Sequence, residues 1–95
     1  MPFYLTKKAK NDLRNIAVYT QENWGVKQRD YYLDKIDAVF HLVCKASFSG
    51  KKCDEIKSGY FKYNIYKHII LYRKVGLETE IVRILHEKMD ISQHL

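Results

Sequence analysis

The sequence has only two cysteines, Cys44 and Cys53, and their scarcity limits the kinds of site it can build. Two cysteines are too few for a disulfide framework, and a reducing compartment keeps them as thiols. His41 and Cys44 are spaced by one helical turn, but a closed zinc site needs four ligands, and no second pair accompanies them. We therefore expect no metal site and no cofactor.

Long hydrophobic runs are also missing. No apolar stretch approaches the roughly 20 residues that span a bilayer. The N-terminal MPFYLTKKAKNDL lacks the hydrophobic region and the small-residue cleavage site of a signal peptide. We therefore expect a cytoplasmic protein without membrane contact. Since the sequence has 95 residues, we expect a single domain over 1–95, and it contains no internal repeat and no low-complexity tract.

Apolar and basic residues are plentiful. The hydrophobic share of 46% and the aromatic share of 14% are enough for a real core. The net charge is +6, with the lysines and arginines scattered along the chain. Such a charge can simply keep the protein soluble, or it can attract nucleic acid or an acidic protein segment. Composition does not choose between these partners.

Hydrophobic periodicity predicts a helical hairpin over about 7–46. A short strand at 3–6 ends at Thr6, which is a plausible helix N-cap. One apolar stripe then follows a helical period, and a second stripe follows after Gly25, the expected residue after the helix end. We expect Trp24 to be a hydrophobic anchor at the corner. The two stripes consist of Ala9, Leu13, Ile16, Ala17 and Thr20, and of Leu33, Ile36, Val39, Phe40 and Val43.

The second half of the chain predicts a loop and a sheet. Residues 47–59 are small, polar and charged, which is typical of a loop, and Lys51 and Lys52 in it are expected to be simply solvated. Residues 60–87 alternate as a three-stranded antiparallel β-meander, and 88–95 form a C-terminal tail. The order is β-α-α-β-β-β. It indicates an α+β domain with the helical hairpin packed on one face of an antiparallel sheet.

A hairpin turn at Lys67-His68 assigns the strand residues to two faces. It places Lys62 opposite Arg73, and paired residues share a face. One face is apolar or aromatic and is assigned to the helices. The first face carries Phe61, Tyr63, Ile65, Ile70, Tyr72, Val82 and Ile84, and the second carries Lys62, Asn64, Tyr66, Ile69, Leu71, Arg73, Ile81, Arg83 and Leu85.

The second face mixes apolar residues with three cations, although both helices are used on the first. An uncovered apolar patch with basic residues is typical of a binding surface. The alternative is that the loop or the C-terminal tail covers it. We expect partner binding by Lys62, Tyr66, Ile69, Leu71, Arg73, Ile81, Arg83 and Leu85.

Several loose motifs together resemble the ParE branch of the RelE/ParE toxin superfamily, from Leu5 to near the C-terminus. They are Asp12-Leu13, Tyr19-Thr20, Trp24-Gly25, Gly59-Tyr60, His68 with Tyr72-Arg73, and Arg83-Ile84-Leu85-His86 with Met89-Asp90. One departure is the loop KASFSGKKC, which lacks the proline usual in that family; the only proline of the chain is Pro2.

The resemblance implies the same β-α-α-β-β-β fold and the toxin half of a type II toxin–antitoxin pair, of the kind that stabilises plasmids. It implies DNA gyrase as the target, held on cleaved DNA without a reaction catalysed by the toxin. It also implies an acidic antitoxin that folds on the toxin, which suits a basic surface with apolar sockets. No sequence-specific nucleic-acid binding is expected.

The sister RelE branch, which cuts mRNA on the ribosome, is the main alternative. That reaction needs a general base, a general acid and cations around the phosphate. Lys62, Arg73 and Arg83 are candidate cations, but the last strand ends in LHEKMD without a tyrosine. His86 is in phase with Ile84, on the helix side, so we expect it to be structural. We therefore favour a toxin that acts by binding; a homologue that binds antitoxin but has lost toxicity is a third possibility.

Overall fold

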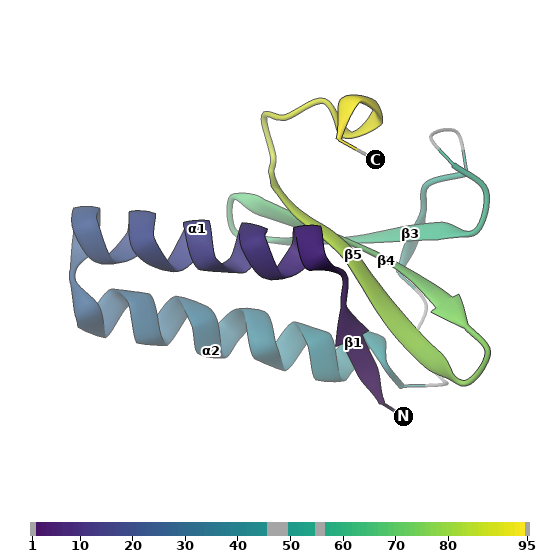
Figure 1. The fold of residues 1–95 in the computed structure, drawn as a ribbon, viewed down its shortest axis with the longest axis horizontal. Helices are drawn as coiled ribbons and strands as arrows, with labels where there is room; N and C mark the ends of the chain where they lie inside the picture. Colours follow the sequence, from purple (N-terminus) through teal and green to yellow (C-terminus); the bar gives the residue numbers. More distant parts are fainter. Residues whose placement is uncertain (1, 46–49, 55–56, 95) are drawn as a thin grey trace.

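The computed structural model describes residues 2–45, 50–54 and 57–94. In this part of the chain, two helices pack on one face of a five-stranded sheet, and the C-terminal tail folds back over the end of the sheet (Figure 1). The predicted α+β class and the helical hairpin on one sheet face are confirmed. No helix of the described ranges is long and apolar enough to cross a membrane.

The two helices are α1 (Lys7–Trp24) and α2 (Val26–Val43), and they run antiparallel as one hairpin. Thr6 is the N-cap of α1, since its Oγ1 accepts a hydrogen bond from the Ala9 N–H at 3.0 Å. Gly25 ends α1 with φ of +92°, and its N–H donates to the Gln21 carbonyl. Both caps agree with the sequence analysis. The predicted hairpin end at 46, however, falls on residues outside those described.

The sheet has the order β1-β5-β4-β3-β2. The antiparallel β3–β4–β5 meander appears as predicted, but β1 pairs parallel to β5, so the sheet is mixed. Lys51 and Lys52 were expected in a solvated loop; they form β2, which pairs antiparallel to β3. The strands are β1 (Phe3–Leu5), β2 (Lys51–Lys52), β3 (Tyr60–Ile65), β4 (His68–Val75) and β5 (Glu78–His86).

The register of the β3–β4 hairpin differs from the prediction by two residues. The turn is at Tyr66-Lys67, with Tyr66 at φ of +51°, and His68 already belongs to β4. Lys62 therefore lies opposite Leu71, so the predicted Lys62–Arg73 pair is wrong. Because the shift is an even number, the residues of β3 and β4 keep their predicted faces.

A β-bulge in β5 overturns one face assignment. Leu71 pairs with Arg83, whereas Tyr72 pairs with Ile81, so Val82 is one extra residue in the ladder. The extra residue reverses the sheet face of the β5 residues that precede it. Ile81 lies in the core under the helices, fully buried, and Val82 packs on the other face. The prediction had these two residues the other way round.

Apolar side chains cluster on both faces of the sheet. The larger cluster lies between helices and sheet and includes Ile36, Phe40, Ile70, Tyr72 and Ile81. The smaller one lies on the opposite face, where Ile91 of the 3-10 helix η1 (Ile91–Gln93) packs against it. The second face is thus covered, as the alternative in the sequence analysis had it. The smaller cluster contains Cys53, Tyr60, Ile69, Leu71 and Leu85.

Candidate functional site

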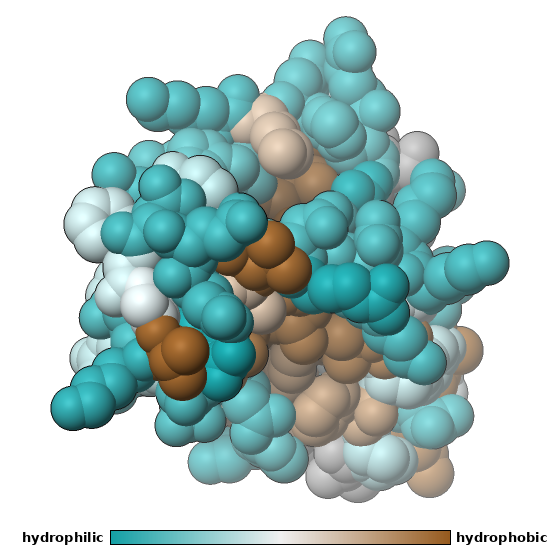
Figure 2. Space-filling model, turned by 60° about the vertical axis from the view of Figure 1, so that its left-hand side comes forward, coloured by the Kyte–Doolittle hydropathy of each residue, from teal (hydrophilic) through white to brown (hydrophobic). Residues whose placement is uncertain are grey.

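A groove of about 870 Å³ lies between the distal half of the helical hairpin, the β3–β4 turn and the end of β5. Large exposed side chains form its rim: Tyr19 is 63% exposed, Trp24 69% and Tyr66 60%, and Tyr31 and Met89 are about half exposed. On the face turned toward the helix corner, apolar side chains gather between hydrophilic ones (Figure 2). We call this feature the aromatic groove. Exposed aromatic side chains of this kind are typical of protein-binding surfaces.

Three side chains from three elements meet at the floor of the aromatic groove. Tyr32 of α2 forms a hydrogen bond between its hydroxyl and Nδ1 of His68. The His68 ring lies edge-on to His86, with 5.5 Å between ring centroids. In the other direction, Tyr32 packs against the rim residue Tyr66, with ring centroids 5.6 Å apart. Contacts between these aromatic and imidazole rings therefore join the sheet to the helices at the floor of the groove.

Burial fixes the protonation of two of these groups. It raises the pKa of Tyr32 to about 12, so the hydroxyl keeps its proton well above neutral pH and can donate it to Nδ1 of His68. Burial, with a smaller contribution from His86, lowers the pKa of His68 below its usual value. At neutral pH, His68 is consequently neutral, and its tautomer with the proton on Nε2 leaves Nδ1 to accept from Tyr32.

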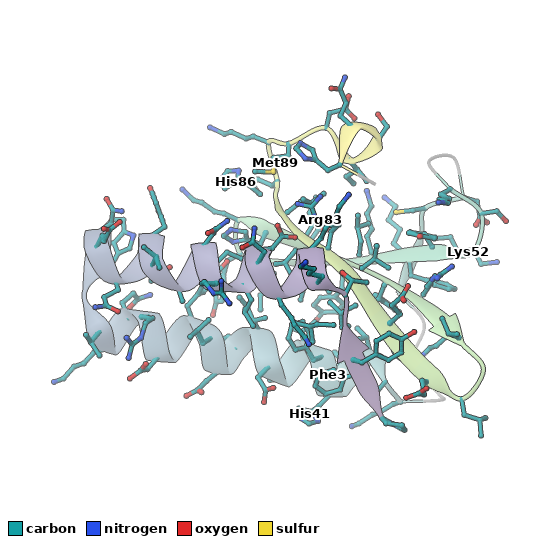
Figure 3. The ribbon with its side chains drawn as sticks, viewed as in Figure 1. Phe3, His41, Lys52, Arg83, His86 and Met89 are labelled. Carbon is teal, nitrogen blue, oxygen red and sulfur yellow. The ribbon has the colours of Figure 1, made fainter. Side chains whose placement is uncertain are left out.

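Arg83 is tied into the fold beside the groove. Its Nε and Nη2 donate to the two carboxylate oxygens of Asp12 in α1, each at 2.8 Å, and its Nη1 donates to the His94 carbonyl at 2.7 Å. Figure 3 shows Arg83 between α1 and the C-terminal tail. The hydrogen bonds that Arg83 donates to the Asp12 carboxylate raise the pKa of Arg83 above its usual value. The side chain is thus one half of an ion pair, and both partners are mostly buried.

The predicted apolar patch is buried in this structure. Ile69, Leu71 and Leu85 are at most 7% exposed, because the tail and the segment around β2 cover them, and Ile81 lies under the helices. The expectation that these four residues form an open surface is therefore wrong. The covering segments are separated from β4 and β5 by turns and by residues outside the described ranges. Periodicity within the strands therefore does not predict that these segments cover the patch.

The other residues assigned to the second face separate in space. Arg73 forms an ion pair with Glu80 at 2.6 Å, whereas Lys62 stays on the face away from the helices. Tyr66 leaves that face for the hairpin turn and lines the aromatic groove. Of the eight residues predicted to bind a partner, Tyr66 alone lines the groove.

The residues predicted to be structural also have different places. Trp24 is not a buried anchor: it stands on the rim of the groove, since Thr20 is the last residue of its stripe to be buried. His86 lies on the helix side, as its parity with Ile84 predicted, and its Nδ1 accepts from the Lys88 N–H at 3.2 Å. His86, the last residue of β5, and Met89, in the tail that follows, lie close together (Figure 3).

Sequence reasoning missed most of the groove. Tyr19 and Tyr31 lie off the apolar stripes of their helices, and an aromatic residue off a stripe is a signal that was available. His68 was predicted to lie in the hairpin turn, although it begins β4 opposite His86. Among the described residues, no group of three or more side chains is arranged to hold a metal ion.

Residues 3–91 match the family described as the ParE toxin of the type II toxin–antitoxin system, parDE. The chain belongs to the ParE toxin family. Among curated members, Toxin ParE1 of Caulobacter vibrioides is 32% identical over 94 residues, which are 99% of this chain and 97% of the relative. Toxin ParE1 of Mycobacterium tuberculosis is 33% identical over 94 residues, which are 98% and 96% of the two chains.

A solved structure has the same fold. The structure described as the chromosomal ParDE TA system from P. aeruginosa superposes with a TM-score of 0.77 at 19% identity, covering 90% of this chain and 95% of the other. At that identity the likeness shows the fold alone. For this ParE-family chain, the resemblance to ParE toxins inferred from the sequence is confirmed, and so is its place in a toxin–antitoxin system.

Proposed function

We propose that this ParE-family toxin acts by binding DNA gyrase without catalysing a reaction, and that an acidic, amphipathic antitoxin neutralises it by filling the aromatic groove. The observation that carries the proposal is the groove itself, with its exposed tyrosines and tryptophan. Its floor is closed by packed rings, and its rim offers the rigid aromatic anchors that dominate protein–protein affinity.

The charge of the toxin supports an acidic partner. Lys67 lines the groove, and the chain carries a net charge of +6. Apolar sockets with basic surroundings fit a segment that presents apolar residues on one side and carboxylates on the other. Of the residues proposed from the sequence, we keep Tyr66 as an apolar contact. Lys62 and Arg73 remain proposed contacts only for a partner that reaches the opposite sheet face.

The paired imidazoles at the floor are the observation that favours a ribosome-dependent endonuclease instead. RNA cleavage by acid–base catalysis also needs cations near the phosphate. Here Arg83 is tied to Asp12 and Arg73 to Glu80, so neither guanidinium is free to serve the imidazoles. Among the described residues that line the groove, Lys67 is the single lysine or arginine, so one cation at most is at hand for His68 and His86. We therefore favour binding over catalysis.

Two assays of the purified toxin test the target. We expect inhibition of gyrase supercoiling, or gyrase-dependent DNA cleavage, with relief when the antitoxin is added. A reconstituted translation mixture supplies the comparison, and we expect its mRNA to stay intact. Cleavage of mRNA with no effect on gyrase would contradict the proposal. Overexpression that leaves growth unharmed would instead indicate a homologue without toxicity.

Tyr19→Ala tests the groove, with Leu77→Ala as the matched control. Leu77 is 79% exposed in the β4–β5 turn and does not line the groove. Loss of an aromatic anchor should weaken antitoxin binding by about 2 kcal/mol, a roughly 30-fold rise in Kd, whereas the control should bind like the wild type. The antitoxin is expected to be a small acidic protein encoded immediately upstream. Titration calorimetry measures both values, and equal Kd values would rule out the groove.

Trp24 reports the same event without a substitution. It is the single tryptophan of the chain and stands exposed on the rim of the groove. A segment seated in the groove should shift its emission to the blue and protect it from acrylamide. An antitoxin that binds tightly but leaves Trp24 as accessible as before binds elsewhere.

A further inference from the structure

A second charged surface lies away from the aromatic groove, where β2 meets β3. Lys51 and Lys62 are direct cross-strand partners, and Lys62 is in turn opposite Leu71. Leu71 belongs to the cluster on the face away from the helices, so both lysines lie on that face. Lys57 adds a third cation, with its Nζ 5.5 Å from the centroid of the Tyr60 ring, which belongs to the same cluster as Leu71. We call Lys51, Lys57 and Lys62 the lysine edge.

The fold holds β2 in this place through specific contacts. The Gly50 N–H donates to the Tyr72 hydroxyl at 2.8 Å, and the Cys53 N–H donates to the Tyr60 carbonyl at 2.8 Å. A Cβ at Gly50 would clash with the Tyr72 hydroxyl and lie 2.9 Å from the Lys62 carbonyl oxygen, so only glycine permits this approach. The result is two like charges directly opposite each other, an arrangement that costs stability unless an anion bridges them.

None of the three lysines has a carboxylate partner among the described residues. The neighbouring cations are different: Arg73 pairs with Glu80, and Lys74 donates to the Val43 carbonyl at 2.6 Å and to the Thr79 hydroxyl at 2.9 Å. The lysine edge is therefore the part of this face whose positive charge the described residues leave uncompensated.

The chemistry of the surface favours a sugar-phosphate backbone over a protein segment. A bound protein segment needs apolar sockets as well as charge, but the apolar residues here lie under the tail: Leu71 is fully buried and Ile69 is 7% exposed. A phosphate backbone needs only a run of cations, and lysines supply it without sequence preference.

We propose that the lysine edge contacts the phosphate backbone of nucleic acid, independently of base sequence. The contact is separate from the aromatic groove, and it is expected whichever protein the toxin acts on. β2, marked by Lys52 in Figure 3, lies well apart from His86 and Met89 at the groove. A segment seated in the aromatic groove therefore does not by itself cover the lysine edge.

The double variant Lys51→Gln/Lys62→Gln tests the proposal. Its matched control is Lys10→Gln/Lys27→Gln, which removes two exposed lysines from the helices. A fluorescein-labelled DNA duplex of mixed sequence is the probe, and anisotropy is measured over a range of salt concentrations. Loss of two phosphate contacts should lower the slope of log K against log salt by about 2 and weaken binding at low salt about tenfold or more. The control should keep most of the affinity and slope.

Several results would overturn the proposal. One is wild-type binding to DNA that is undetectable at low salt; another is an equal loss in both double variants. Retained DNA binding together with lost binding to poly-glutamate would identify an acidic protein segment as the partner. If the Lys51/Lys62 variant binds DNA as the wild type does, the proposal is wrong. The two lysines would then serve to keep the edge strand β2 from pairing with strands of other molecules.

A second measurement does not depend on the variants. Lysine acetylation of the wild-type toxin, read by mass spectrometry with and without the duplex, should show protection of Lys51 and Lys62 but not of Lys10. Equal protection of all three would contradict the proposal. The Gln variant should unfold at the same or a higher denaturant concentration than the wild type, because it loses a like-charge pair.

Discussion

The hydrogen bond from Tyr32 to His68 shows how single residues set the floor of the aromatic groove. Tyr32 is protonated at neutral pH and can donate, and His68 can accept because burial lowers its pKa and keeps its ring neutral. His86 lies edge-on to the same ring and lowers the pKa of His68 further, whereas the charge of Glu87 raises it. The arrangement works only while His68 is neutral, so it depends on pH.

We expect the stability contributed by His68 to disappear in mild acid. Its pKa in the folded protein is below the ordinary value of about 6.5, so below that pH the unfolded chain binds more protons than the folded one. Stability is therefore fully present above about pH 6.5 and falls as the pH drops toward the folded-state pKa. His68→Asn keeps an acceptor for Tyr32 but cannot titrate.

Urea unfolding at a series of pH values measures this effect. The difference in unfolding free energy between the wild type and His68→Asn should be largest near pH 7.5 and shrink toward about pH 5. The difference between the two proteins removes the contribution of the carboxylates, which is common to both. A difference that stays constant across the series would mean that His68 has the same pKa in both states.

At the scale of elements, the helices were the most predictable part. Ile36, Val39, Phe40 and Val43 are buried because their spacing places them on one side of α2, and spacing is visible in a sequence. Gly25 ends α1 as predicted, because the positive φ of the residue after the helix favours glycine. These features depend on neighbours in the chain.

The sheet was predictable only as far as local pattern determines it. The single extra residue Val82 exchanges the faces of Ile81 and Val82, and no residue type marks a bulge in EIVRIL. The covering of Leu71 depends on Ile91, twenty positions away, and on a segment around Cys53. The groove was missed for the same reason: Trp24, Tyr66 and Met89 are brought together by packing between elements.

The Asp12–Arg83 ion pair connects three elements. β1 pairs with β5 only as far as Ile81, so the next part of β5 has an open edge. Asp12 of α1 fills it: its carboxylate accepts from the Ile84 N–H at 3.0 Å as well as from Arg83. Since Arg83 also binds the His94 carbonyl, helix, strand and tail share one polar junction.

Arg83→Met should destabilise the folded chain by about 2 to 3 kcal/mol, because it leaves a mostly buried carboxylate without its partner. Asp12→Asn removes the charge but keeps an amide oxygen that still accepts from the Ile84 N–H. It should therefore lower the free energy of unfolding by less than the loss of the charge alone suggests. The double variant should be less destabilised than the sum of the two, with a coupling of about 1 to 2 kcal/mol. Urea unfolding measures all four proteins. Strict additivity would show that the two side chains contribute independently.

The whole molecule presents two kinds of surface in different places. The aromatic groove offers rigid anchors at the distal end of the helical hairpin, and the lysine edge offers charge without exposed apolar sockets at the far side of the sheet. Anchors act at contact distance, whereas charge acts over about 10 Å at ordinary salt. The groove should therefore govern how long a partner stays, and the charge of the whole chain how fast it arrives.

This division predicts separate effects on the two rate constants for an acidic antitoxin. Lys51→Gln/Lys62→Gln lowers the net charge from +6 by two, to +4, without touching the groove. We expect it to slow association at low salt and to leave dissociation unchanged. Tyr19→Ala should do the reverse, because the loss of an anchor speeds dissociation by up to about 30-fold.

Stopped-flow measurement of Trp24 fluorescence gives both constants. Association of the wild type should slow by about tenfold or more from low to high salt, since the Debye length falls from about 30 Å to about 3 Å over that range. The charge variant should converge on the wild-type rate at high salt, where the lost charges are screened. Association that ignores salt would contradict electrostatic attraction, and a charge variant that changes mainly the dissociation rate would place Lys51 or Lys62 inside the antitoxin contact.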